Sequence, residues 1–238
     1  MSNVRRFKKY SIEELERYIA TVPLQRPITN IQVHHTFLPT LAQYAATANK
    51  ESVIRGMWNY HVNTNGWMDI AQHFSIAPDG VWDGRPLEWD SGGFLGAENK
   101  GGICLEIIGD FDIGREAFAG DIAENTYRTV AAILRRWPTA DIRFHRDQPS
   151  AKGKKTCPGT SILKPAFVAS VNLRLKPLSA SAIIAEKSGI GAEGWTANEA
   201  KHPAYARLAK VVAEDWDALG KVPWIGEWFK KVGGALGN

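Results

Sequence analysis

Apolar and polar residues alternate most regularly in residues 70–85, IAQHFSIAPDGVWDGR, with a Pro-Asp-Gly turn in the middle. Such alternation on both sides of a turn predicts a β-hairpin. Residues 101–111, GGICLEIIGDF, form instead a nearly continuous apolar run, which is typical of a central strand buried on both faces. Shorter strands are predicted at residues 29–35, TNIQVHH, and at residues 142–145.

Helical spacing of apolar residues is found between these strands. Ser11 and Glu14 have the spacing of a capping box, which predicts that a helix begins there and extends to about residue 21. Further helices are predicted at residues 50–62 and at residues 121–136, where Pro138 follows the second one. Helices and strands therefore alternate along the chain, which indicates an α/β fold.

The candidate catalytic motifs all precede residues 176–177, and the segments after that point have a helical pattern. We predict a catalytic domain over residues 1–177, with its core at about 28–170, and a small helical C-terminal domain over residues 178–238. Three interpretations of the C-terminal domain remain open. It binds the cell wall through some of its tryptophans, its last stretch is an amphipathic helix that touches a membrane, or it is a simple packed helical domain. The tryptophans concerned are Trp195, Trp216, Trp224 and Trp228.

Composition and charge exclude some classes of function and indicate the compartment. The net charge of +4 is too small to indicate a nucleic-acid partner, and the chain has no apolar run long enough for a membrane span. The basic N-terminus is not followed by an apolar segment, so we expect no signal peptide and a reducing compartment. In that compartment Cys104 and Cys157 are expected to be free thiols or metal ligands rather than a disulfide.

Three residues form a candidate metal site. His34 and His145 each stand at the end of a predicted strand, and Cys157 follows His145 by twelve residues. Zinc accepts imidazole and thiolate ligands together, and a catalytic site combines three protein ligands with a water. The three residues lie far apart in the sequence, so their spacing alone does not define a metal site.

Four motifs add a resemblance to a known family. In order along the chain they are VHHTF, DIAQHFSIAPDG, GGICLEIIGDFD and FHRD followed by KKTCPG. Together they resemble the zinc amidases of the N-acetylmuramoyl-L-alanine amidase and peptidoglycan recognition protein superfamily. The resemblance implies a central mixed sheet flanked by helices, with zinc in a surface groove held by His34, His145 and Cys157. It also implies that Lys155 stabilises the developing oxyanion.

The general base is predicted from a position at which members of the family differ. Phage and recognition-protein relatives place a tyrosine where this chain has Gln72, whereas other relatives use a glutamate three residues before a glycine. Glu106 occupies that place before Gly109. A carboxylate within an apolar strand is costly to bury unless it is hydrogen-bonded or functional. We therefore predict that Glu106 is catalytic, with a structural hydrogen-bonding role as the alternative.

The resemblance implies a zinc-dependent amidase that cuts the bond between the lactyl group of N-acetylmuramic acid and L-alanine in peptidoglycan. We predict a monomeric phage or prophage endolysin, made in the host cytoplasm and released to the wall through a holin. A bacterial autolysin and a peptidoglycan-binding recognition module without activity are the alternatives. The presence of Cys157, Lys155 and Glu106 together favours an enzyme over a binding module.

Overall fold

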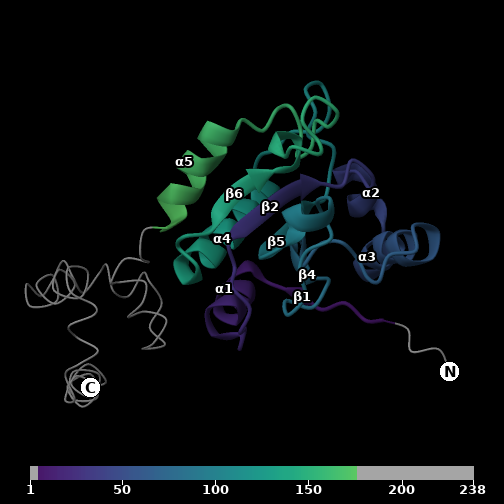
Figure 1. The fold of residues 1–238 in the computed structure, drawn as a ribbon. Helices are drawn as coiled ribbons and strands as arrows, with labels where there is room; N and C mark the ends of the chain where they lie inside the picture. Colours follow the sequence, from purple (N-terminus) through teal and green to yellow (C-terminus); the bar gives the residue numbers. More distant parts are fainter. Residues whose placement is uncertain (1–4, 176–238) are drawn as a thin grey trace, which may run out of the picture. The chain divides into compact units, whose positions relative to one another are not determined.

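The computed structural model describes residues 5–175. The predicted C-terminal domain, residues 178–238, lies outside the described residues, so its three interpretations stay predictions. Within the described part, helices and strands alternate along the chain and the helices flank a sheet (Figure 1). The predicted α/β fold class is confirmed. No helix in residues 5–175 is long and apolar enough to cross a membrane.

A six-stranded mixed sheet has the order β1-β4-β3-β5-β2-β6. Its strands are β1 Lys9–Tyr10, β2 Asn30–His35, β3 Phe74–Ala77, β4 Gly80–Asp83, β5 Gly102–Ile107 and β6 Asp141–Phe144. The four strands β3, β5, β2 and β6 run parallel to one another. β4 and β1 add antiparallel pairs at the β3 edge, and β3 and β4 form the hairpin that alternation predicted.

Helices cover the sheet. They are α1 Ile12–Thr21, α2 Leu41–Ala46, α3 Lys50–Asn59, α4 Asp121–Arg136 and α5 Lys164–Leu175, with short π or 3-10 turns η1 Tyr60–Thr64, η2 Gly96–Asn99 and η3 His145–Asp147. α4 packs against both α1 and α5, and all three contribute to the main apolar core. α3 instead packs in a second, smaller cluster through Ile54.

The predicted start of α1 is confirmed in detail. The Ser11 hydroxyl accepts a hydrogen bond from the backbone N–H of Glu14, and the Glu14 carboxylate accepts one from the backbone N–H of Ser11. This reciprocal pair satisfies two donors that a helix N-terminus otherwise leaves open. The buried face of α1 then packs on α4 through Leu15 and Ile19.

Candidate metal centre and pocket

Two neighbouring parallel strands place polar side chains on the side of the sheet opposite the main core. On β2, Val33 is buried in that core, so two-residue alternation turns His34 to the other side. On β5, Leu105 is in the core and Glu106 faces the other side for the same reason. His34 and Glu106 are direct partners in the parallel register. The pairing of β2 with β5 therefore brings the two side chains together.

His145 and Cys157 reach the same place from the end of β6. Since β6 pairs with β2, the turn η3 that follows it begins next to His34. The rings of His34 and His145 have centroids 4.5 Å apart, and Cys157 Sγ lies 3.5 Å from His34 Nδ1. One ligand-type atom from each of the three residues lies within 4.8 Å of the others. The fold thus brings together all three residues predicted as ligands, which we call the ligand group.

The ligand group fits a zinc ion. A tetrahedral zinc site with usual bond lengths places sulfur and nitrogen roughly 3.6 Å apart. The separation of 3.5 Å between Cys157 Sγ and His34 Nδ1 is close to that value. Burial lowers the pKa of His34 well below its usual range, so the imidazole is neutral and its nitrogen is able to bind a cation.

The thiol of Cys157 is buried beside several polar groups. Burial, and then the Glu106 carboxyl, raise the pKa of the thiol. The backbone N–H of His35, which donates to Sγ at 3.4 Å, and the charges of Arg146 and Lys155 act in the opposite direction. A cation bound at Sγ favours the thiolate, because metal binding and deprotonation are coupled.

The chain between His145 and Cys157 is held by Arg146. The backbone N–H of Arg146 donates to the carbonyl of Cys157 at 2.9 Å, and its guanidinium donates to the carbonyl of Gly159 at 2.6 Å. These bonds fix the cysteine-bearing turn against the end of β6. Lys155 is exposed on this turn, and its positive charge adds to burial in lowering the pKa of His145.

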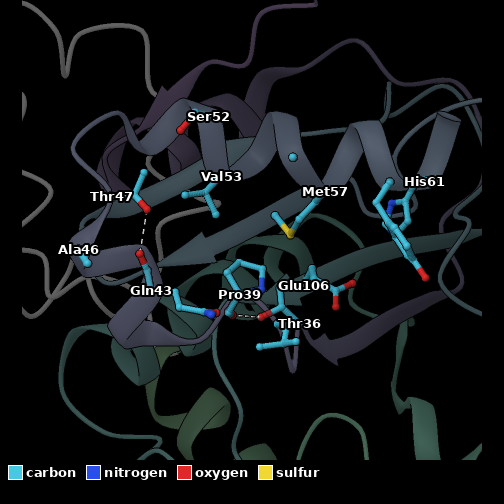
Figure 2. A pocket seen from close by; sticks show the side chains of 13 residues that line it. Thr36, Pro39, Gln43, Ala46, Thr47, Ser52, Val53, Met57, His61 and Glu106 are labelled. Carbon is cyan, nitrogen blue, oxygen red and sulfur yellow. Dashed lines mark hydrogen bonds between the residues drawn. The ribbon is translucent and has the colours of Figure 1, made fainter. Parts of the chain in front are cut away.

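Glu106, the partner of His34 in the β2–β5 register, lines a pocket of about 740 Å³. Residues of α2, α3 and η1 and the segment after β2 supply the other walls. In Figure 2 the Glu106 carboxylate lies between Thr36 and His61, with Met57 above it. Burial raises the pKa of Glu106 to about 8. Within residues 5–175 no hydrogen bond or ion pair holds this carboxyl, which argues against a structural role.

Two other histidines have structural roles. His35 accepts a hydrogen bond at Nδ1 from the backbone N–H of Phe111 at 3.1 Å. His73 accepts one at Nδ1 from the backbone N–H of Cys104 at 2.9 Å, and its Nε2 donates to the carbonyl of Trp89 at 3.0 Å. Neither histidine belongs to the ligand group. Both cysteines are free and buried.

Gln72 stands where the resemblance places a tyrosine in some relatives. Its side chain is buried and donates from Nε2 to Ser75 Oγ at 2.9 Å. It does not belong to the pocket wall, whereas Glu106 does. The structure therefore makes Glu106, and not Gln72, the side chain that is available to a molecule in the pocket.

One neighbour of the ligand group was not predicted. The ring of Phe94 contacts both imidazole rings from an irregular loop between β4 and β5. Periodicity cannot mark a residue in such a loop, since neither the helical nor the strand repeat applies there. The signal in the sequence is the large apolar pair Phe94-Leu95 between glycines, in GGFLG.

A mixed sheet with two histidines and a cysteine gathered at the ends of β2 and β6, beside a pocket lined by Glu106, defines an α/β protein with a candidate zinc centre. The family model described as N-acetylmuramoyl-L-alanine amidase (Amidase_2) matches residues 24–160, which is more than half of the chain and includes every member of the ligand group. The chain belongs to this family.

Relatives with the same description occur in mammals. The N-acetylmuramoyl-L-alanine amidase of Homo sapiens is 30% identical over 164 residues, covering 63% of this chain and 27% of the human protein. That of Sus scrofa is 32% identical over 168 residues, covering 66% of this chain and 26% of the pig protein. The chain thus spans about a quarter of the length of these relatives. Peptidoglycan-recognition protein SC1a of Drosophila melanogaster is 33% identical over 95 residues, covering 39% of this chain and 48% of that protein.

Peptidoglycan recognition proteins are among the solved structures that match this chain. PGRP-SA of Apis mellifera has 18% identity and a TM-score of 0.49, covering 58% of this chain and 81% of that chain. Drosophila PGRP-LB has 21% identity and a TM-score of 0.47, covering 57% of this chain and 77% of that chain.

Proposed function

We propose that this protein is a zinc-dependent N-acetylmuramoyl-L-alanine amidase. It hydrolyses the amide between the lactyl group of N-acetylmuramic acid and the L-alanine of peptidoglycan. The observation that carries the proposal is the approach of His34, His145 and Cys157 to within 4.8 Å of one another, next to a pocket lined by Glu106. Family membership and the two amidase relatives support the substrate class.

Glu106 is the proposed general base and acid. A zinc ion held by the ligand group would supply a Lewis acid that polarises the amide carbonyl and acidifies a water. The Glu106 carboxylate takes a proton from the water as its oxygen bonds to the carbonyl carbon. Glu106 then returns that proton to the amine nitrogen as the carbon–nitrogen bond breaks. A pKa of about 8 makes the ionised carboxyl a strong base and its protonated form a usable acid near neutral pH.

Lys155 has an electrostatic role in this proposal. It is exposed on the turn that carries Cys157, and its charge influences both His145 and Cys157. A cation on this turn also stabilises negative charge that develops on the carbonyl oxygen during attack. Its exposure leaves the side chain free to adjust to the substrate.

A recognition module without activity is the second candidate, because recognition proteins are among the relatives. Glu106 argues against this alternative, because its carboxyl lines the pocket and no donor in residues 5–175 forms a hydrogen bond with it.

For the biological setting we propose a phage or prophage endolysin released through a holin, with a bacterial autolysin as the alternative. Co-expression with and without a holin separates these settings, because an endolysin lyses its host only when the holin is present.

Two variants test the chemistry. Purified peptidoglycan is incubated with the wild type, Glu106→Gln and Cys157→Ser, and both the new L-alanine amino termini and the bound zinc are measured. We expect Glu106→Gln to keep its zinc and to lose activity by about 10²–10⁴-fold, the usual contribution of a general acid–base group. Cys157→Ser is expected to lose both zinc and activity.

Three results would contradict the proposal in different ways. A wild type that binds peptidoglycan without releasing amino termini is a recognition module. Full activity of Glu106→Gln removes the role of Glu106. Unchanged zinc content in Cys157→Ser removes Cys157 from the ligand set.

A further inference from the structure

A loop between β4 and β5 covers the ligand group with an aromatic ring. Phe94 is buried, with 7% of its surface exposed. Its ring centroid lies 5.1 Å from that of His34 and 5.5 Å from that of His145, tilted by 45° and 39°. Because the two imidazoles also contact each other, the three rings form one packed cluster.

Asn99 fixes Phe94 in this place. Its Oδ1 accepts a hydrogen bond from the backbone N–H of Phe94 at 2.7 Å, and its Nδ2 donates to the Phe94 carbonyl at 2.9 Å. One amide side chain thus satisfies both backbone groups of Phe94, as a neighbouring strand would. The Ser91 hydroxyl oxygen lies 2.7 Å from Asn99 Oδ1 and is also within hydrogen-bond distance of Gln32 Oε1 on β2, so it links the loop to the sheet.

The same loop lies tightly against His34 at Gly93. A β-carbon added at Gly93 would lie 2.7 Å from His34 Nε2 and 2.5 Å from Cys104 Sγ, which is too close for either contact. The loop backbone therefore touches the imidazole edge, and only glycine fits there.

His34 lacks the support that a metal-binding histidine usually has. Such a histidine normally donates its second ring N–H to a carboxylate, a carbonyl or water, and this bond sets the ring orientation. His34 Nε2 is buried and has no hydrogen-bond partner within residues 5–175. The orientation of the His34 ring therefore depends on packing, and Phe94 and Gly93 supply that packing.

We propose that residues 91–99 form a built-in cover for the metal site, in which Phe94, held by Asn99, keeps the rings of His34 and His145 in their ligating orientation. Phe94 and Asn99 are thus positioning residues. The cover replaces the missing hydrogen bond at His34 and excludes water from that side of the site. This inference rests on the zinc site proposed above.

The test is a measurement of zinc affinity on the full chain. Wild type, Phe94→Ala and Asn99→Ala compete for zinc with a chromophoric chelator, and zinc loss to excess chelator is followed in time. Changes in the groups that orient metal ligands typically cost 10–100-fold in affinity. We expect a loss of about tenfold or more in both variants, with faster zinc release.

Leu95→Ala is the matched control, since Leu95 adjoins Phe94 but has 71% of its surface exposed. We expect this variant to bind zinc as the wild type does. Unfolding of the metal-free proteins is measured in parallel, so that zinc affinity is compared only where each variant is folded.

The outcomes separate the two proposals. A wild type that binds no zinc contradicts the zinc site and the cover together. If the wild type binds zinc and folded Phe94→Ala binds it equally well, the cover is wrong while the zinc site stands. An equal loss in Leu95→Ala also contradicts the cover, because the effect would then be general to the loop.

Discussion

The surroundings of Glu106 determine the pKa of its carboxyl. The pKa of about 8 arises from burial, without a charged partner. A lysine or arginine in direct contact would lower that pKa and weaken the base. Lys155 is instead exposed on the cysteine-bearing turn, where its charge acts on His145 and Cys157. In the metal-free protein Glu106 thus has a raised pKa although Lys155 is nearby, and a zinc ion held by the ligand group would lower that pKa.

Gly93 offers a prediction at the same scale. Gly93→Ala places a β-carbon 2.7 Å from His34 Nε2, so the ring or the loop has to move. We expect zinc affinity to fall by about tenfold, the lower end of the usual effect of disturbing ligand orientation. Chelator competition measures it. Gly56→Ala in α3 is the control, because an added β-carbon there meets nothing within 4 Å. Equal zinc affinity in folded Gly93→Ala would show that the contact has no influence on His34.

The residues of the ligand group were identifiable in the sequence as candidates because each stands in a short motif. VHHTF contains His34, and KKTCPG contains Cys157 and Lys155. Phe94 was not predictable, since its importance comes from where an irregular loop lies in space. The same holds for the raised pKa of Glu106: the sequence indicates a carboxyl in an apolar strand, but only the fold determines how much water reaches it.

Among the elements, the junction of β3 and β5 depends on a side chain. Beyond the pair Phe74 and Leu105, the ladder continues through the backbone N–H of His73, which donates to the Cys104 carbonyl at 2.8 Å. The backbone N–H of Cys104 in turn donates to the side chain of His73, at Nδ1. The imidazole therefore extends the pairing of the two strands, and it does so only while Nδ1 is unprotonated.

This arrangement predicts a pH dependence of stability. Burial lowers the pKa of His73 to about 3, from about 6.5 in the unfolded chain. Below pH 6.5 His73 binds a proton in the unfolded state but stays neutral in the folded state. The free energy of unfolding therefore decreases as the pH is lowered. Between pH 7 and 5 the loss from His73 is about 2 kcal/mol. We expect urea unfolding at pH 7 and pH 5 to show a smaller decrease in the free energy of unfolding for His73→Gln than for the wild type. Equal falls would mean that His73 does not contribute.

Element prediction succeeded for the most regular patterns, although α5, with twelve residues, was not predicted. The spacing of apolar residues located α4, and the continuous apolar run located β5. α2, with six residues, and β1, with two, are too short to display a period and were not predicted. The sheet order was not readable either, because the pairings that join β5 to β2 and β3 depend on contacts between distant segments.

At the scale of the whole molecule, the family match and the candidate site both lie within the first part of the chain. The match ends at residue 160, and residues up to Leu175 form a compact unit of their own. Every residue named above for the ligand group, together with Glu106 and Lys155, lies in this unit. Removal of residues 176–238 therefore takes no side chain away from the proposed chemistry.

A chain that ends at Leu175 is expected to fold, to bind zinc and to hydrolyse a soluble muropeptide at the rate of the full chain. If the C-terminal domain binds the wall, as one interpretation of its sequence has it, the shortened chain sediments less with intact cell walls and acts on them more slowly. The comparison of soluble and insoluble substrate isolates this effect, since a damaged site slows both reactions. Equal sedimentation of the two chains with walls would contradict the wall-binding interpretation. Loss of activity on the soluble muropeptide would instead show that residues 176–238 support the catalytic unit.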